Sequence, residues 1–536
     1  MKTNSCLYIT ACLSKSDRLL DPELLFATTQ DPFQAADVIT VPGSEAQSGS
    51  SSGAQRRNRS AAIRHAAERF NRRLSIPDHP DNGDEANYPN KIGSYSKGLP
   101  HNSLGEVDRD AYNALIHALN TGQPTDFENI PMGCPVPADQ RKLVNPMAGL
   151  AFDLEGTDSH QFGIPPAPAF ASAQEASEMT ELYWMALLRD VNFLDYESST
   201  AAQEAAADLS ALSDFRGPKV AGRVTTGTLF RDDLPGCLQG PYISQFMLRN
   251  TPFGAEFVER RMRTLLPGSD HVTDYSEWLS IQNGCVPSQP ALFDPVGRYI
   301  RNGRDLSQWV HIDMLFQAYF NAMLILLTPP DPSDPVTGGG VGAPPNPGNP
   351  YLNSRTQEGF GTFGGPYCAT ITCEPATRAL KAVWFQKWFV HRRLRPEMFG
   401  GRVHNRMIGA ASYPIHPDVL NSNALKGVKD AHDTYLLPLA FPEGSPLHPA
   451  YGTGHGTVAG ACVTILKAMF DESYVLPNPV VPSADGLSLV PYTGPDADSL
   501  TVGGELNKRA EQAGLQHRYR SQHCRGSLAH RCSRSV

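Results

Sequence analysis

Two separate stretches of this sequence carry side chains that could bind and activate an anion. In the first stretch, KWFVHRRLRP, Lys387 and Arg395 stand eight positions apart in a segment that we predict to be helical. Eight positions correspond to roughly 2.2 turns of an α-helix, so both cations would lie on about the same face and could hold one anion. The alternative is a solvated basic helix end, whose charges favour the helix dipole. A nuclear-localisation signal in HRRLR is a weaker alternative.

The second stretch, HPAYGTGH, runs from His448 to His455 and leads into a predicted helix over Thr453 to Phe470. The Thr453 hydroxyl, the Gly454 amide and the His455 imidazole supply an O–H donor, an approachable N–H group and an acid/base group. A helix N-terminus also favours a bound anion. The pattern predicts a pocket for a tetrahedral oxyanion, with a simple turn followed by an N-cap threonine as the alternative.

Helices must position these residues, because alternating β-patterns are scarce in this sequence. Helical spacing predicts a long helix over Ala171 to Tyr196, a buried helix over Val310 to Leu327, and a helix that begins at Pro375 and continues to Arg395. We therefore predict a mainly α fold, in which any strands form small hairpins.

Composition shifts divide the chain into regions. Residues 43–60 are Gly/Ser-rich with a basic end, and Pro and Gly are dense from Thr328 to Pro366. From N- to C-terminus we expect a flexible arm (1–60), an N-terminal helical region (61–330), a Pro/Gly-rich connection (331–366), a helical bundle region that carries the candidate site (367–508), and an aberrant tail (509–536).

Charge and cysteine content exclude several classes of protein. The 536 residues carry 46 basic and 55 acidic side chains, a formal charge of −9, which argues against a dedicated nucleic-acid binder. Ten cysteines without a CxxC pair indicate neither a zinc ribbon nor a disulfide-dense scaffold. We expect Cys368 and Cys373 to be free thiols, with a loop disulfide as the alternative.

No membrane span is expected, because the most apolar segment contains His311 and Asp313, which are costly in a bilayer. The apolar stretch Cys6 to Leu13 is weak for a signal peptide. We predict a soluble protein, and its location, cytoplasmic or periplasmic and exported, stays open.

Taken together, K-x7-RP and the later TGH resemble the signature shared by vanadium-dependent haloperoxidases and the acid phosphatases of the same superfamily. Five further stretches are similar to the algal and cyanobacterial bromoperoxidase branch: ELYWMALLRDV, GFGTFGGP, HRRLRPE, HP-x-Y-x-x-GH and GELNK. The resemblance extends from about residue 60 to Lys508. It implies a mainly α fold built around two four-helix bundles, with the site at one bundle end.

The resemblance also implies roles for individual residues. Lys387 and Arg395 would bind vanadate oxygens, and Lys387 would also polarise bound peroxide. Thr453, where the family usually has serine, and the Gly454 N–H would complete the vanadate site. His455 would be the acid/base partner of the apical vanadate oxygen.

A halide pocket is implied by two more residues. His448 matches a second histidine typical of bromoperoxidases, and Trp384 would lie near the halide path. The alternatives are a histidine satisfied within a turn and a core aromatic residue. Red-algal relatives tend to carry arginine in place of Trp384, so the preference among halides stays open.

The activity implied is that of a vanadate-dependent haloperoxidase. Hydrogen peroxide oxidises bromide, or iodide or chloride, to hypohalous acid, which halogenates a small organic acceptor, while vanadium(V) acts as a Lewis acid. An acid phosphatase and a catalytically silent oligomeric scaffold are the alternatives, and His448 argues against the phosphatase. By the same resemblance we expect a homo-oligomer, from dimer to dodecamer, and a structural calcium, although no EF-hand-type loop is present.

The tail departs from the family, which has a late Arg-x5-His motif that supplies the apical vanadium ligand. This histidine is not identifiable in the present reading frame. One codon choice for residues 516–532, read one nucleotide later, gives NIAIGRNIAGVHWRTD, which is similar to the missing motif. We therefore hypothesise a frameshift between Lys508 and Gln516, which would leave the chain as written a poor vanadate binder, or inactive. The alternative is a divergent tail in which a histidine, His517, His523 or His530, binds the metal.

Overall fold

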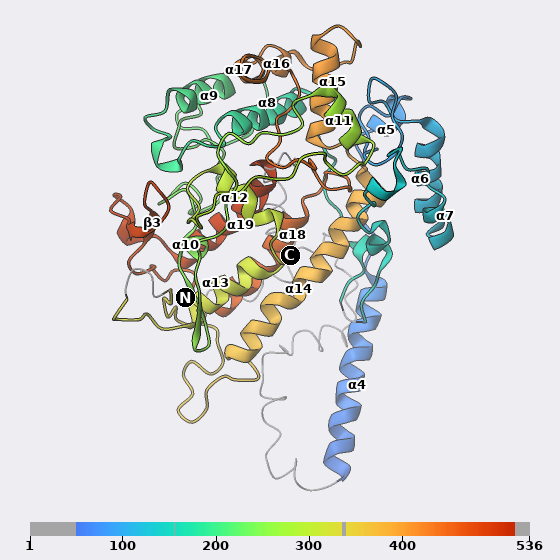
Figure 1. The fold of residues 1–536 in the computed structure, drawn as a ribbon. Coiled ribbons are helices and arrows are strands. Elements are labelled where there is room, and N and C mark those ends of the chain that lie inside the picture. The colour runs from blue at the N-terminus through green and yellow to red at the C-terminus, as the bar shows by residue number, and fades with distance from the viewer. Residues whose placement is uncertain (1–49, 155, 335–338, 520–536) are drawn as a thin grey trace.

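The computed structural model describes residues 50–154, 156–334 and 339–519, and within these ranges the fold is mainly helical (Figure 1). Strands there form two short antiparallel hairpins. One pairs β1 (Thr251–Phe253) with β2 (Glu256–Val258), with Pro252 opposite Phe257. The other pairs β3 (Val480–Pro482) with β4 (Leu489–Pro491), with Val481 opposite Val490. The predicted mainly α class with small hairpins is confirmed.

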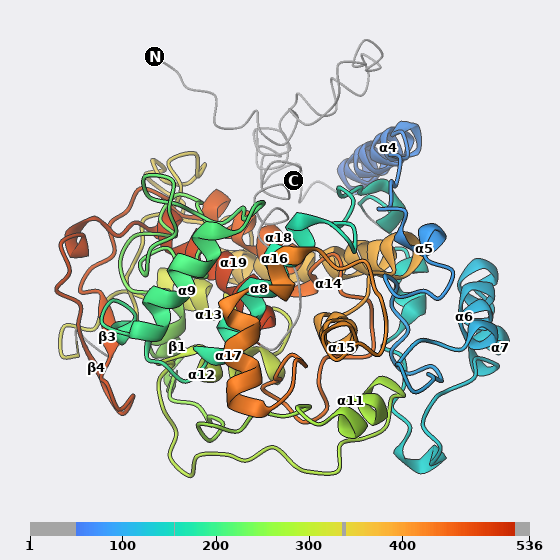
Figure 2. The same cartoon turned by 90° about the horizontal axis from the view of Figure 1, so that it is seen from above.

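The helices gather around two hydrophobic cores. The larger core includes Met179, Leu425 and Phe399, and it is covered by helices α8 (Ala173–Leu187), α9 (Thr200–Ala211), α15 (Pro396–Met407), α16 (Pro417–Leu420) and α17 (Asn423–His432). In these helices α8 packs against α9, α16 and α17 (Figure 2). Buried Leu and Met side chains on several faces of α8 explain why it is central rather than peripheral.

The second core lies where α14 (Gly365–Phe385) packs along α18 (Gly454–Met469). Helices α12 (Gly303–His311), α13 (Gln317–Leu327) and α19 (Val502–Tyr519) complete this group. Helix α14 spans both cores, because Ala376 belongs to the second core while Trp384 belongs to the first. The C-terminal end of α14 is therefore held between two packed bodies.

The remaining helices are α5 (Asp84–Asn87), α6 (Arg109–Thr121), α7 (Pro124–Glu128), the fully buried α10 (Gln245–Leu248) and α11 (Tyr275–Gln282), with the 3-10 turns η2 (Pro137–Asp139), η3 (Pro146–Leu150), η4 (Ser159–Gln161), η5 (Phe193–Asp195) and η7 (Ala497–Ser499). A disulfide joins Cys134 to Cys285, a pairing that the sequence did not indicate. Cys368 and Cys373 both lie on α14 as free thiols, as predicted.

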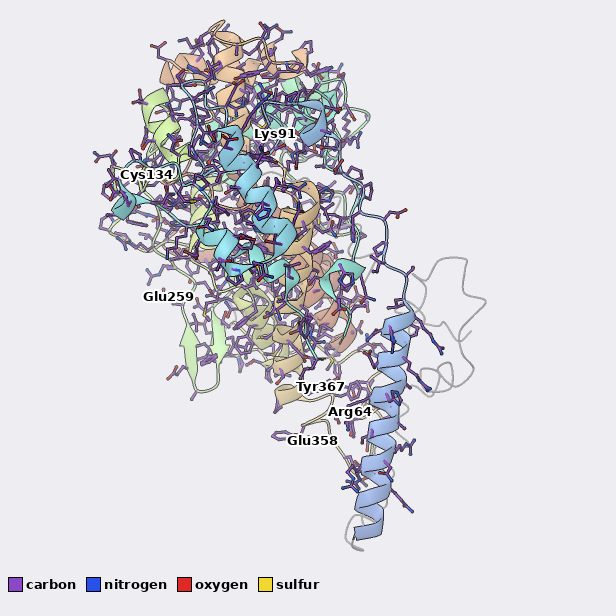
Figure 3. The ribbon with its side chains drawn as sticks, turned by 90° about the vertical axis from the view of Figure 1, so that its right-hand side faces the viewer. Arg64, Lys91, Cys134, Glu259, Glu358 and Tyr367 are labelled. Atoms are coloured by element: carbon purple, nitrogen blue, oxygen red, sulfur yellow. A yellow bond between two sulfur atoms is a disulfide. The ribbon has the colours of Figure 1, made fainter. Side chains whose placement is uncertain are left out.

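At the N-terminal side, α4 (Ser50–Arg73) projects from the body as a long exposed helix (Figure 3). The predicted flexible arm over residues 1–60 therefore ends too late, because Ala54, Gln55, Arg56 and Arg57 are good helix formers and extend the helix back to Ser50. Residues 1–49 lie outside the described residues.

Three predicted helix bounds are wrong. Helix α8 ends at Leu187, before Tyr196, because the chain turns so that buried Arg189 can bond Asp270 and the Pro438 carbonyl. The helix predicted over Val310 to Leu327 is broken into α12 and α13, with Asp313 in the break. Helix α14 begins at Gly365, ten residues before Pro375, which lies inside the helix.

The predicted helix over Thr453 to Phe470 is confirmed as α18 with Thr453 as its N-cap residue. No helix of the described ranges is both long enough and apolar enough to cross a membrane.

Candidate functional site

The backbone between Lys387 and Arg395 is not the continuous helix that we predicted. Helix α14 ends at Phe385 and passes into a π-helical turn, η6 (Gln386–His391), that carries Lys387. Arg392 then adopts a left-handed conformation with φ of 33°, and Arg395 is the N-cap residue of α15. Pro396 favours a helix start at that point, because its fixed φ suits the first helical position.

Despite this different route, the two cations converge on one loop. Lys387 Nζ donates to the Pro449 and Ala450 carbonyls at 2.8 and 2.9 Å. Arg395 Nη1 donates to the His448 carbonyl at 3.2 Å and lies 3.5 Å from the Pro449 carbonyl. Each cation is only 1% exposed. The loop that joins His448 to Thr453 therefore lies against two buried positive charges.

The N-terminus of α18 follows directly after this loop. Thr453 is buried, and its hydroxyl makes no capping hydrogen bond to the helix. A Cβ on Gly454 would meet the Trp384 ring at 3.3 Å, so glycine avoids a tight contact here. A hydroxyl and a helix N-terminal amide next to two buried cations form a set of donors suited to an oxyanion.

His455, in the first turn of α18, is oriented by a carboxylate. Its Nε2 lies 2.9 and 3.1 Å from the two carboxylate oxygens of Asp313. Because an ionised carboxylate only accepts hydrogen bonds, Nε2 carries the proton and Nδ1 is the basic nitrogen. The break between α12 and α13 is what brings Asp313 to this position.

His448 and Trp384 form a neighbouring aromatic pair. Their ring centroids are 4.9 Å apart, and the Trp384 indole N–H donates to the Val144 carbonyl at 3.1 Å. Lys387 Nζ lies 5.7 Å from the centre of the Trp384 ring. The predicted halide-pocket residues and the predicted anion-binding residues therefore lie together. We refer to Lys387, Arg395, His448, Thr453, Gly454 and His455 as the 387–455 site.

A buried ion pair joins two of the segments that carry this site. Lys97 Nζ lies 2.5 Å from Glu397 Oε1, and both side chains are fully buried. Glu397 also accepts the Ser445 N–H at 2.7 Å, and Lys97 donates to the Ser445 carbonyl at 2.6 Å. These contacts fix α15, two residues after Arg395, to the loop that leads into His448.

Burial shifts the pKa of Lys97, and the Lys97 charge shifts the pKa of Glu397. Burial lowers the pKa of Lys97 to about 7, although the Glu397 carboxylate opposes the shift. Burial alone would raise the pKa of Glu397, but the Lys97 charge and hydrogen bond, with the Ser445 N–H, hold it below its ordinary value. The ion pair is thus a structural part of the site and depends on both partners.

Sequence reasoning missed Asp313, Lys97 and Glu397 as residues that act on the site. Asp313 left a signal, since an acid within a strongly apolar segment needs a partner when it is buried. Glu397 belongs to the HRRLRPE stretch, but no pattern links it to Lys97, which is 300 positions away in the sequence.

The described residues supply cationic, hydroxyl and amide donors that fit the oxygens of a vanadate ion. Vanadate also needs a histidine ligand for the vanadium atom, and the candidates for it are in the tail. The side chain of His517 is not described, and His523 and His530 lie outside the described residues. In the part of the chain that is described, no group of three or more His, Cys, Asp or Glu side chains could hold a metal ion.

Comparison with known proteins identifies relatives of this chain. Vanadium-dependent bromoperoxidases from Corallina pilulifera and Corallina officinalis are each 34% identical to it, over 516 and 513 residues, which is 81% of this chain and 83% of each relative. The vanadium-dependent bromoperoxidase of Ascophyllum nodosum is 36% identical over 437 residues, 78% of this chain and 75% of the relative.

A solved structure matches the fold as well. The homohexameric second vanadate-dependent bromoperoxidase of Ascophyllum nodosum superimposes with a TM-score of 0.82 at 30% identity, over 89% of this chain and 83% of that chain. No family model matches the sequence.

Proposed function

This chain belongs to the family of vanadium-dependent bromoperoxidases, and we propose that it is a vanadate-dependent haloperoxidase whose vanadate lies in the 387–455 site. Its reaction would combine bromide, or iodide or chloride, with hydrogen peroxide and a proton to give hypohalous acid and water. The hypohalous acid then halogenates an organic acceptor. The observation that carries this proposal is the convergence of Lys387 and Arg395 on the loop next to Thr453 and Gly454.

Vanadate, when bound, supplies a Lewis acid that activates the peroxide without changing oxidation state. The protein contributes positive charge and hydrogen-bond donors. Lys387 and Arg395 would bind the vanadate oxygens, and the Thr453 hydroxyl and the Gly454 N–H would bind from the helix end. Because the two cations are buried, their interaction with an anion is screened less than it would be at the surface.

We assign proton transfer to His455. Asp313 fixes the ring and leaves Nδ1 as the basic nitrogen, which can accept a proton from the substrate side and return it as the reaction proceeds. His448 and Trp384 would border the path of the halide, since their rings are in contact beside Lys387. Asp313 would act through His455 as a positioning residue.

The acid phosphatase alternative uses the same type of oxyanion pocket, and all three relatives named above are bromoperoxidases rather than phosphatases. The scaffold alternative applies to the chain as written if no histidine of the tail reaches the metal. The bromoperoxidase assignment has the stronger support, because the halide-pocket pair His448–Trp384 accompanies the anion-binding residues.

For the tail we retain the frameshift proposal and narrow its place. Beyond Arg509, two side chains of α19 bond to neighbouring loops: Glu511 accepts the Asp232 N–H at 2.7 Å, and Gln512 donates to the Tyr242 carbonyl at 2.6 Å. This packing favours a change of reading frame after Ala513 rather than before it. Resequencing the locus tests the proposal, which is wrong if the present frame is intact and its codons do not encode the shifted motif.

We also propose that the chain forms a homo-oligomer, supported by the homohexameric state of its structural relative. A structural calcium, and the cytoplasmic or exported location, stay predictions from the sequence.

The test of the proposed function is bromide-dependent halogenation of monochlorodimedone by the purified chain, with and without orthovanadate and hydrogen peroxide. A chain with the shifted frame restored serves as the comparison. We expect vanadate-dependent activity in the restored chain and little in the chain as written. If the restored chain halogenates nothing, the proposed function is wrong, and if both chains are equally active, the frameshift account is wrong.

A further inference from the structure

Two arginines outside the 387–455 site are buried near each other, with neighbours from both hydrophobic cores. Arg260 follows β2 and is 4% exposed, and Arg509, on α19, is 1% exposed. The Arg260 guanidinium lies 4.4 Å from the centre of the Trp309 ring, and Arg509 lies 5.5 Å from the centre of the Tyr319 ring. We call them the Arg260–Arg509 pair.

The surrounding elements bring the two arginines to one region. Arg260 Nε is within 3.4 Å of the Met247 carbonyl on α10, and Trp309 belongs to α12. Both α10 and α12 pack against α19, the helix that carries Arg509 (Figure 1). In agreement with this placement, burial and the Arg509 charge lower the pKa of Arg260 to about 9. Burial also lowers the pKa of Arg509.

The described residues supply no counter-charge that bonds to this pair. Neither arginine forms an ion pair within the described ranges, and three buried nitrogens there have no hydrogen-bond partner: Arg260 Nη2, Arg509 Nε and Arg509 Nη1. Asp313 is the carboxylate whose charge acts on Arg509, but both of its oxygens bond to His455. Two buried guanidinium groups thus have donors directed at nothing in the described protein.

Burying a charge without a partner is strongly unfavourable, and a guanidinium does not escape the cost by losing its proton at neutral pH. A bound anion removes the cost, because it neutralises charge and accepts the unused N–H groups. We propose that the Arg260–Arg509 pair binds a monovalent halide ion, bromide or chloride, at a structural site that shares no residue with the 387–455 site.

The lining favours a halide over an oxyanion. Aromatic rings, Trp309 and Tyr319, cover the guanidinium groups, and the Trp309 indole N–H is another buried donor without a partner. A tetrahedral oxyanion is larger and strongly hydrated, and it needs several directional donors on different sides. A single large, weakly hydrated ion can be satisfied by a few N–H donors in otherwise apolar surroundings.

The first test is thermal unfolding of the full chain at constant ionic strength, with sodium bromide or sodium chloride replacing sodium gluconate. An ion that binds the folded state alone raises Tm until the site is saturated, and we expect a rise of about 2–4 °C. Bromide and chloride titrations identify which halide binds more tightly. Equal Tm values in halide and gluconate would overturn the proposal.

The variants Arg509→Leu and Arg260→Met locate the effect. Each should remove the dependence of Tm on halide, and each should be at least as stable as the native chain in gluconate, because a buried charge has been replaced by an apolar side chain. Two variants are used so that failure of one to fold leaves the other. Arg261→Met, an exposed neighbour that pairs with Glu259, is the matched control and should keep the halide response.

Lys387→Met separates this proposal from the proposed function. It should keep the halide-dependent rise in Tm even though it removes a cation from the 387–455 site. If Lys387→Met loses the rise while Arg509→Leu and Arg260→Met keep it, the halide binds at the 387–455 site and the structural site is wrong. Crystals grown in bromide should show an anomalous peak between Arg260 and Arg509, and a peak elsewhere alone would contradict the proposal.

Discussion

The 387–455 site and the Arg260–Arg509 pair both bury two cationic side chains, yet their surroundings differ. At the 387–455 site the cations lie beside a helix N-terminus, a threonine hydroxyl and a carboxylate-oriented histidine. Around the Arg260–Arg509 pair, the neighbours include the aromatic rings of Trp309 and Tyr319.

The difference in surroundings determines which anion each pair of cations can bind. Directional donors on several sides select a tetrahedral oxyanion, and an acid/base group beside them permits chemistry. Two guanidinium groups under aromatic rings can neutralise a single ion but offer no group that exchanges a proton near neutral pH. On this view the first region is catalytic and the second is structural.

The largest expected effect comes from the ion pair that supports the 387–455 site. Glu397→Gln leaves the Lys97 ammonium buried without its counter-ion, which should lower the free energy of unfolding by about 3–5 kcal/mol. Denaturant unfolding measures the loss. The double variant with Lys97→Met and Glu397→Met is the control and should recover much of it, since it removes both charges. A single variant as stable as the native chain would show that the pair does not hold α15 to the loop.

The same ion pair gives a pH dependence with a definite sign. Since the folded protein holds the pKa of Glu397 below its unfolded value, the carboxylate contributes stability above about pH 4.5. That contribution is lost as pH falls through the folded pKa. The unfolding free energy of the native chain should therefore decline more steeply in acid than that of Glu397→Gln, and parallel curves would contradict this assignment.

The next largest effect is expected when the 387–455 site loses a cation. Lys387→Met removes a buried donor to a developing negative charge, which costs on the order of 10²–10³ in kcat. The halogenation assay on the restored-frame chain measures it. Lys381→Met, on α14 just before the turn that carries Lys387 but paired with Asp153 at the surface, is the matched control and should keep nearly full activity. Equal losses in both variants would indicate a general effect on folding.

A smaller effect is expected when His455 loses its orienting carboxylate. Asp313→Asn keeps the shape of the side chain but removes its charge, and we expect a loss of about 10–100-fold in kcat. The pH profile should change shape as well, because the substitution acts on a proton-transfer group. A uniform loss at every pH would assign Asp313 to packing alone.

The smallest expected effect concerns the halide path. Trp384→Phe keeps an aromatic ring against His448 but loses the hydrogen bond to the Val144 carbonyl, worth about 1 kcal/mol. KM for bromide should rise by about fivefold while kcat changes less. A change in kcat with an unaltered KM would remove Trp384 from the halide path.

The sequence predicted one site for Lys387, Arg395 and the 448–455 stretch through its resemblance to a family, whereas the prediction from helical spacing was wrong, because the helix is interrupted between the two cations. It did not predict the route itself. The π-helical turn at η6 and the left-handed Arg392 depend on tertiary packing around Trp388 rather than on local propensity.

Contacts between distant segments were also beyond the sequence. Lys97 meets Glu397, and Asp313 meets His455, only because two packed bodies bring remote loops together. The break between α12 and α13 was not predicted for a related reason: the apolar pattern does not distinguish one continuous buried helix from two helices separated by a turn.

The most direct test of the central claim, that the 387–455 site holds vanadate, is calorimetric titration of orthovanadate into the chain as written, the restored-frame chain and its Lys387→Met variant. We predict saturable binding to the restored chain and at least about 100-fold weaker binding to the chain as written. The Lys387→Met variant of the restored chain should bind orthovanadate more weakly than the restored chain itself. Equally tight binding to the restored chain with and without Lys387 would contradict the account.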